Sequence, residues 1–320
     1  MKALYRISSQ FVVLSLLLMS ADVSAGQPAA SAEPQIIIEA GEHNYMNARW
    51  SPDGSTIAFT ADQFTGLWLA DSQGKEVRQL SNDAAIGFGF SWSPDGTHIL
   101  GRSSTFINNR RFQEIKIIDV NTGAEEVLLP LSRNIRMVPV WSMDASHVAV
   151  VAGNSPQFFS TAGMQKNALP DVPGIAVFSD HGMLYFSDPK NKTEYRIAEF
   201  EGRNIFNLAL SPTGDKAVFQ LGGLGLHVIN TDGSGFRHLG HAEQASWMPD
   251  GRHIIATLIS DDGYRITGGV LYAIDVLTGQ TYPLTENTGI TALRPEVSPC
   301  GNYVLFDNPD DGNIYLLELK

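Results

Sequence analysis

The stretch Trp50-Ser51-Pro52-Asp53-Gly54 decides the fold, because it returns as Trp92-Ser93-Pro94-Asp95-Gly96 and in five weaker copies further along the chain. Proline fixes φ and cannot continue a central strand, and Asp-Gly favours a tight turn. A short run rich in β-branched and aromatic residues, such as 57–60, follows each copy. Each copy therefore predicts a strand, a turn and a strand. The residues that mark the repeat most clearly are Trp50, Asp53, Gly54, Trp92, Asp95, Gly96, Trp141, Trp247, Asp250 and Gly251.

The repeat has the length of a propeller blade. Successive copies lie 32 to 50 residues apart, and segments such as 67–71 and 77–80 supply a third and a fourth strand between them. A period near 40 residues with four antiparallel strands is typical of β-propellers. We therefore predict an all-β fold, a β-propeller of seven four-stranded blades. The single 32-residue interval leaves little room for a fourth strand, so six blades is the alternative.

The two ends of the repeat region predict how the ring closes. The last unit ends with a third strand at 314–319 and has no fourth, whereas residues 35–39 form a strand that precedes the first Trp copy. We expect this N-terminal strand to complete the last blade, which removes exposed sheet edges. The domain prediction is a signal peptide at 1–25, a disordered leader at 26–34 and a single propeller domain at 35–320.

Residues 1–25 have the pattern of an export signal. Lys2 and Arg6 precede an apolar run at 11–19, and Val23-Ser24-Ala25 is typical of a cleavage site. An N-terminal membrane anchor is the alternative, although the apolar run is short for a span. We expect an exported protein, periplasmic or extracellular, with no membrane span after cleavage.

Composition and missing motifs narrow the function. The net charge of −12 argues against nucleic acid as a partner. Cys300 is the only cysteine, so no internal disulfide can form. We find no phosphate-binding loop, dinucleotide fingerprint or nucleophile elbow in the sequence. His98, His147 and His253 lie in different repeats, and the neighbouring His238 and His241 have no evident third ligand, so we expect neither a catalytic set nor a metal site.

Binding residues are expected on one face of the propeller. The repeat turns share the opposite face and are short, whereas the loops joining second to third strands, and those between blades, are longer and more varied. We predict that residues 103–112 form a long loop there. Arginine and aromatic side chains gather in these loops, a composition typical of interface hot spots and of anion-binding grooves. The candidate binding residues are Tyr45, Phe64, Phe106, Arg110, Arg111, Phe112, Arg133, Arg136, Tyr264, Arg265 and Arg294.

The pattern Trp-Ser-Pro-Asp-Gly-x-x-Ile-Ala-Phe at 50–59 resembles the repeat of TolB-type, WD40-like propellers, and 92–100, 247–256 and 298–306 match it as well. The resemblance covers the expected propeller and implies its fold more than its function. TolB itself carries an α/β domain before its propeller, and the short segment before the first strand here indicates a different protein. Oligogalacturonate lyases also look similar; that resemblance implies a metal near the propeller axis.

Two functions remain open from the sequence. The first is a non-catalytic binding module of the cell envelope, a monomer without a cofactor that binds a protein or peptide partner or an anionic small ligand or oligosaccharide. The second is a carbohydrate-active enzyme resembling oligogalacturonate lyase, or a lactonase, with a divalent metal in the central channel. Under this second hypothesis the residues of interest are His43, Arg136, His227 and Arg294. We favour the binding module over an enzyme.

Overall fold

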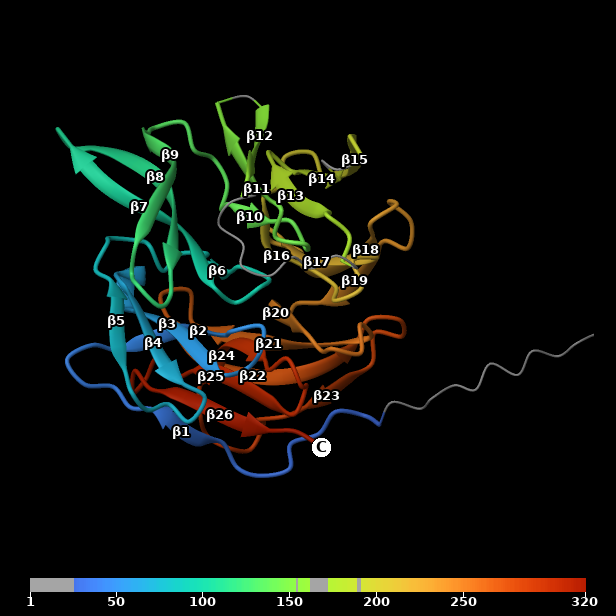
Figure 1. The fold of residues 1–320 in the computed structure, drawn as a ribbon. Helices are drawn as coiled ribbons and strands as arrows, with labels where there is room; N and C mark the ends of the chain where they lie inside the picture. Colours follow the sequence, from blue (N-terminus) through green and yellow to red (C-terminus); the bar gives the residue numbers. More distant parts are fainter. Residues whose placement is uncertain (1–25, 154, 162–171, 189–190) are drawn as a thin grey trace, which may run out of the picture.

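Seven antiparallel sheets form a ring in the computed structural model, which describes residues 26–153, 155–161, 172–188 and 191–320 (Figure 1). The prediction of an all-β, seven-bladed propeller is confirmed, and the six-bladed alternative is wrong. The expected signal peptide at 1–25 lies outside the described residues. In the described part of the chain, no helix has the length and apolar character that a membrane span needs.

Five blades have four strands each. The first contains β2 (Tyr45–Trp50), β3 (Thr56–Ala61), β4 (Leu67–Asp71) and β5 (Arg78–Ser81); the second β6 (Ser91–Trp92), β7 (His98–Ile107), β8 (Arg110–Asp119) and β9 (Glu125–Ser132); the fifth β16 (Ile205–Leu210), β17 (Lys216–Leu221), β18 (Gly225–Asn230) and β19 (Arg237–Gly240); the sixth β20 (Glu243–Trp247), β21 (His253–Asp261), β22 (Ile266–Asp275) and β23 (Thr281–Pro283); and the seventh β24 (Leu293–Val297), β25 (Tyr303–Asp307), β26 (Ile314–Glu318) and β1 (Gln35–Ile38).

The third and fourth blades show three strands each among the described residues. The 32-residue interval of the sequence corresponds to the fourth blade. The third strand of this blade ends at Glu199, and the first strand of the fifth blade begins at Ile205. The strands of these two blades are β10 (Val140–Trp141), β11 (His147–Ala152) and β12 (Ser155–Ser160), and β13 (Ala176–Asp180), β14 (Met183–Asp188) and β15 (Thr193–Glu199).

The first strand of the chain closes the ring, as predicted. β1 pairs antiparallel with β26, with Gln35 opposite Leu316 and Ile38 opposite Ile314. Beyond the strand, Ala30 forms an isolated bridge with Leu319. The N-terminal segment is therefore the outer strand of the seventh blade, and both ends of the repeat region lie in one sheet (Figure 1).

The hydrophobic core is divided into seven clusters, one at each interface between neighbouring blades. Leu305 of the seventh blade packs with Ile57 of the first, and Ala58 packs with Ile99 of the second. Because both sheet faces are covered by neighbours, the second and third strands are apolar on both sides, as Ile57, Ala58 and Phe59 show.

The repeat turns have the geometry that their residues favour. In the first copy, Ser51 Oγ donates to Asp53 Oδ1 at 2.6 Å and accepts from the backbone N–H of Thr56 at 3.0 Å. Gly54 has φ of 71° and donates to the Ser51 carbonyl at 2.8 Å. The bond from Ser51 is the largest cause that holds the pKa of Asp53 below its usual value. The second copy has the same bond between Ser93 and Asp95.

A polar chain runs along the inner strands from the sixth blade to the second. Gln244 Oε1 accepts from the backbone N–H of Arg294 at 3.0 Å, and Arg294 Nε donates to Asp307 Oδ1 at 2.8 Å. Asp307 Oδ1 also accepts from the backbone N–H of Asn47 at 3.0 Å, and Asn47 Nδ2 donates to the Gly87 carbonyl at 3.0 Å. Gln244, Arg294 and Asn47 have positive φ and sit at the same position of the repeat. The bulges in β20 and β2 turn Gln244 and Asn47 toward the next blade, whereas the bulge in β24 turns Arg294 toward Asp307 of its own blade.

The predicted loop at 103–112 is wrong, because these residues are paired strand. β7 and β8, of ten residues each, form a hairpin in which Ile107 lies opposite Arg110. Asn108 and Asn109 have φ of 51° and 59°, as a two-residue hairpin turn requires. Asparagine tolerates this conformation better than other residues with a side chain, which explains a tight turn without glycine.

Candidate ligand-binding site

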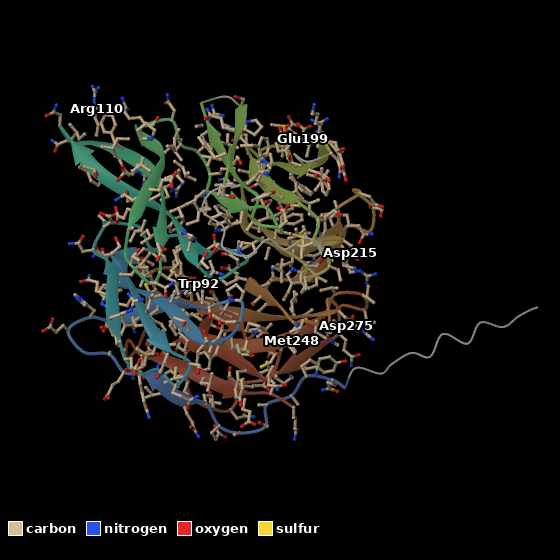
Figure 2. The ribbon with its side chains drawn as sticks, in the orientation of Figure 1. Trp92, Arg110, Glu199, Asp215, Met248 and Asp275 are labelled. Atoms are coloured by element: carbon tan, nitrogen blue, oxygen red, sulfur yellow. The ribbon has the colours of Figure 1, made fainter. Side chains whose placement is uncertain are left out.

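Two long hairpins project from one face of the propeller. β7–β8 and β21–β22 each join the second to the third strand of a blade, so both turns leave the ring at the same end of their sheets. We call this the hairpin face. Tyr264 at the second turn is 99% exposed, and Phe106 near the first is 69% exposed. Figure 2 shows Arg110 at the outer end of the first hairpin, whereas Trp92 lies toward the middle of the ring.

Strand alternation places four polar side chains on one face of the β7–β8 hairpin. Ser104 lies opposite Gln113 in the ladder, and Phe106 lies opposite Arg111. Arg102 is two residues before Ser104, so it lies on the same side of the sheet. The loop between the first and second blades runs along the inner edge of β7, where the backbone N–H of Ser104 donates to the Ala84 carbonyl at 2.9 Å.

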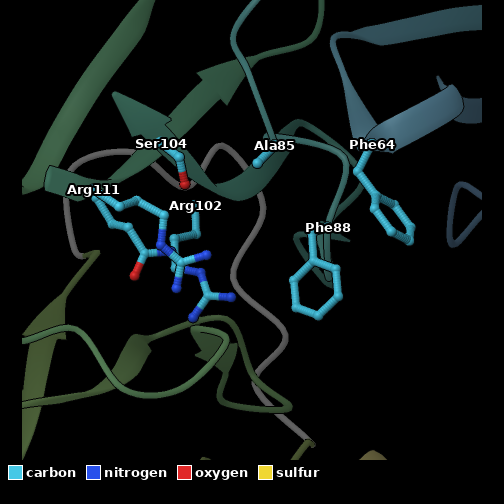
Figure 3. Close-up of a pocket in the computed structure, with 7 residues that line it drawn as sticks. Phe64, Ala85, Phe88, Arg102, Ser104 and Arg111 are labelled. Carbon is cyan, nitrogen blue, oxygen red and sulfur yellow. The ribbon is translucent and has the colours of Figure 1, made fainter. Parts of the chain in front are cut away.

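A hollow of about 340 Å³ is lined by this face of the hairpin, by the loop between the first and second blades and by Phe64 of the first blade. Figure 3 shows the side-chain ends of Arg102 and Arg111 directed into the same space, with Phe88 and Phe64 on its other side. Phe64 and Phe88 meet edge to face, with ring centroids 5.1 Å apart. The side chains that define this arginine pocket are Phe64, Phe88, Arg102, Ser104, Arg111 and Gln113.

Arg102 is the more buried of the two arginines in the pocket. Its Nη1 donates to the Met137 carbonyl at 3.1 Å, and its guanidinium lies 5.5 Å from the centroid of the Phe88 ring. Burial, with a smaller contribution from the charge of Arg111, lowers the pKa of Arg102 to about 10. The chemistry of the pocket is therefore that of a cationic site with an aromatic wall.

Two of the predicted binding residues, Phe64 and Arg111, line the arginine pocket. Phe106, Arg110 and Tyr264 are exposed on the two hairpins. Arg133 is exposed before the third blade, and Phe112 is half-buried on the opposite side of β8 from Arg111.

The other predicted residues are engaged in local contacts. Tyr45 packs against Phe59, with ring centroids 4.9 Å apart. Arg136 lies 3.5 Å from Asp180 Oδ2, and Arg265 Nε lies 3.9 Å from Asp262 Oδ2. Arg294 forms two bonds to buried Asp307 and belongs to the polar chain of the inner strands.

The sequence prediction missed Arg102, Ser104, Phe88 and Gln113 as pocket residues. The polar composition of 103–112 favoured a loop, and a loop has no alternation from which a shared face can be derived. For Arg102, Ser104 and Gln113, the sequence signal is the pair Asn108-Asn109 between two runs with a period of two. Read as a hairpin, these runs place Arg102, Ser104, Arg111 and Gln113 on one side.

A second hollow, of about 310 Å³, lies on the face of the repeat turns and is lined by turn prolines with Trp50, Trp247 and Glu296. Glu296 Oε2 lies 3.3 Å from Arg49 Nη1. Burial raises the pKa of Glu296, and the charge of Arg49 opposes this shift. Because its carboxylate is already paired, this hollow offers a ligand fewer free polar groups than the arginine pocket.

The residues of the enzyme hypothesis lie in separate surroundings. The ring of His43 lies 5.5 Å from that of Trp68 in the first blade, whereas the His227 and His238 rings lie 4.9 Å apart on the outer strands of the fifth. Within residues 26–153, 155–161, 172–188 and 191–320, no three His, Cys, Asp or Glu side chains are grouped to hold a metal ion.

Solved structures with this architecture define the protein class as a β-propeller. The β-propeller domain of Cps50 (Swd1) from Myceliophteria thermophila aligns with a TM-score of 0.61 over 90% of this chain and 100% of that one, at 13% identity. TolB from Acinetobacter baumannii aligns with a TM-score of 0.51 over 91% of this chain and 67% of that one, at 16% identity. The oligogalacturonate lyase of Vibrio parahaemolyticus aligns with a TM-score of 0.56 over 89% and 91%, at 13% identity.

These likenesses are at the level of fold: the chain is a β-propeller whose fold is similar to those of the TolB and Swd1 propellers. No protein-family model matches the chain. Among curated proteins, the uncharacterized peptidase YuxL of Bacillus subtilis is 41% identical over 66 residues, which are 19% of this chain and 10% of that protein. The match therefore spans about a tenth of the length of YuxL and carries no activity over to this chain.

Proposed function

We propose that this protein is an exported, non-catalytic propeller that binds a protein or peptide partner in the cell envelope through the hairpin face. The observation that carries the proposal is the exposure of Tyr264 and Phe106 on two hairpins that project beyond the ring. Large aromatic side chains are enriched at binding hot spots, and arginine accompanies them there. Arg110 and Arg265 lie at the same two hairpin ends. The sequence pattern predicted to be an export signal at 1–25 favours this location, and the proposal requires no cofactor.

The test is a quantitative pull-down from envelope extract of the source organism with the tagged protein. The variant Phe106→Ser/Tyr264→Ser removes both exposed aromatic side chains from the hairpin face. The matched control Val77→Ser/Leu277→Ser removes two exposed apolar side chains from third-to-fourth-strand turns, which lie on the opposite face of the ring. Both variants change exposed positions and are expected to unfold at the wild-type temperature.

We expect a partner that the wild type and the control retain in equal amounts and that the Phe106→Ser/Tyr264→Ser variant loses at least tenfold. A partner lost equally from both variants, or retained by both, contradicts binding through the hairpin face.

A further inference from the structure

The arginine pocket contains two cations without a counter-ion. Neither Arg102 nor Arg111 forms a salt bridge with any described carboxylate, and the described side chains that line the pocket include no acid. Arg102 uses one N–H on the Met137 carbonyl, which fixes the guanidinium in place. A guanidinium has five N–H donors, so both arginines still present donors to the hollow.

Nearby carboxylates are directed away from the pocket. Lys116 Nζ lies 2.7 Å from Asp83 Oδ2, 2.8 Å from Glu125 Oε2 and 3.2 Å from Glu114 Oε1. Lys116 and Glu114 alternate with Ile115 and Gln113 along β8, so they lie on the other side of the hairpin from the pocket. The acidic side chains therefore gather around Lys116 on one side of the hairpin, and Arg102 and Arg111 lie on the opposite side.

A buried hydroxyl in the pocket also lacks a partner. Ser104 is 8% exposed, and its Oγ has no hydrogen-bond partner in the described part of the chain. The Ser104 hydroxyl points into the space that Arg102 and Arg111 share (Figure 3). A buried polar group without a partner is destabilising, and a ligand that accepts its hydrogen bond removes this penalty. Buried Gln113, directly across the ladder, adds an amide donor at the same level.

We propose that the arginine pocket binds the carboxylate of a ligand whose apolar part packs on Phe64 and Phe88. Guanidinium groups match the planar carboxylate with paired N–H donors, and Ser104 supplies a further donor. The edge-to-face phenylalanine pair forms an apolar wall beside the cations. A hollow of about 340 Å³ has the size of a small-molecule site.

Two kinds of ligand combine a carboxylate with an apolar part: a free aromatic acid, and the carboxy-terminus of a peptide that ends in an apolar residue. The assignment goes beyond the proposed function, because a free acid can occupy the pocket whether or not the hairpin tips bind a protein. Failure of one proposal therefore leaves the other standing.

The experiment is a calorimetric titration of the full chain, purified from cells that express it, with four probes. These are 3-phenylpropionate, 3-phenylpropionamide, the peptide N-acetyl-Ala-Ala-Phe with a free carboxylate, and the same peptide with a carboxamide end. We expect the two carboxylates to bind at least about tenfold more tightly than their amides, since only they carry the charge that the arginines recognise. Tighter binding by the peptide than by 3-phenylpropionate assigns the pocket to a carboxy-terminus, and the reverse order assigns it to a free acid.

Three variants test the residues. Arg111→Gln changes an exposed side chain, so it is expected to fold, and it should weaken carboxylate binding about tenfold. Arg102→Gln/Arg111→Gln should abolish the preference for carboxylate over amide. Arg237→Gln is the matched control, because Arg237 is an exposed arginine of β19 in the fifth blade and does not line the pocket, and it should leave binding unchanged.

The proposal is overturned by any of three results. These are absence of saturable carboxylate binding below about 20 mM, equal affinity for acids and amides, and equal loss of binding in Arg237→Gln and Arg111→Gln. Inorganic phosphate that binds as tightly as 3-phenylpropionate also overturns it, because the phenylalanine wall would then contribute nothing.

Discussion

The indole nitrogen of Trp92 donates a hydrogen bond to the backbone carbonyl of Arg49, 3.2 Å away in the preceding blade. Trp247 forms the equivalent bond with the carbonyl of Ala209, at 3.1 Å. Both tryptophans occupy the first position of the repeat turn, so at these two copies the residue that marks the repeat also links its inner strand to that of the preceding blade. Trp50 and Trp141 occupy the same position, but their indole nitrogens have no partner among the described residues.

This difference predicts unequal effects of the same substitution. Trp247 and Trp141 are both 9% exposed, so replacement by phenylalanine removes a similar buried volume at each site. Trp247→Phe also loses a hydrogen bond, whereas Trp141→Phe removes an unsatisfied donor. We expect Trp247→Phe to lower the free energy of unfolding by about 1 kcal/mol more than Trp141→Phe. Urea unfolding measures both, and equal losses would show that the bond contributes nothing.

Ring closure predicts a strong asymmetry between two isoleucines of β1. Ile38 is 2% exposed and packs in the cluster between the seventh and first blades, whereas Ile36 is 49% exposed. Ile38→Ala should destabilise the protein by about 2–5 kcal/mol, because it leaves a cavity in that cluster. Ile36→Ala is the control and should change the free energy of unfolding by less than about 0.5 kcal/mol.

Thermal and urea unfolding of the two variants check this prediction. Similar, small losses for both would indicate that β1 does not contribute to the fold in solution. A large loss for Ile38→Ala alone supports closure by the N-terminal strand.

The repeat turn was sufficient to predict the blades, because proline, aspartate and glycine restrict the backbone locally. Closure was predictable for a related reason, since an unpaired strand at each end leaves one consistent pairing. The arginine pocket was harder, because Phe88 lies in the loop before β6 and Arg102 in β7, and only the packing of β7 on that loop brings them together. Local propensity at 103–112 indicated a loop, and the ladder with β8 overrode it.

Arg294 shows the limit of composition as a guide to function. Its place among the loop arginines made it a binding candidate, but the bulge in β24 turns it toward Asp307. The sequence signal that distinguishes it is the polar residue three positions before the turn, which Asn47 and Gln244 share.

The Arg294–Asp307 pair predicts a large, non-additive effect on stability. Asp307 is buried, so Arg294→Met leaves a carboxylate without its counter-ion and should destabilise the protein by about 3–5 kcal/mol. The double variant Arg294→Met/Asp307→Leu removes the charge as well and should recover part of that loss. Arg265→Met, at an exposed pair 3.9 Å from Asp262, should change stability by less than about 1 kcal/mol.

A double-mutant cycle from urea unfolding separates the pair from its surroundings. Losses that simply add in the double variant would mean that Arg294 and Asp307 do not interact. If Arg294→Met has the same free energy of unfolding as the wild type, the ion pair does not stabilise the fold, and Arg294 is again a candidate for ligand binding.

His227 predicts how stability depends on pH. Burial is the main cause that lowers the pKa of His227; its contact with the Gly225 carbonyl opposes the shift, and the neighbouring His238 adds to it. The unfolded chain therefore takes up a proton at higher pH than the fold does. The stability that neutral His227 contributes is fully present above the ordinary histidine pKa of about 6.5 and is lost as pH falls toward the lower pKa of the fold.

We expect the melting temperature of the wild type to fall between about pH 7.5 and 5.5, a window that lies above the titration of ordinary carboxyl groups. His227→Phe keeps a ring between Phe219 and Phe236 but cannot take up the proton, so its melting temperature should fall less over the same range. His43→Gln replaces an exposed imidazole and should retain the wild-type slope. Parallel profiles for the wild type and His227→Phe would show that His227 does not carry the pH dependence.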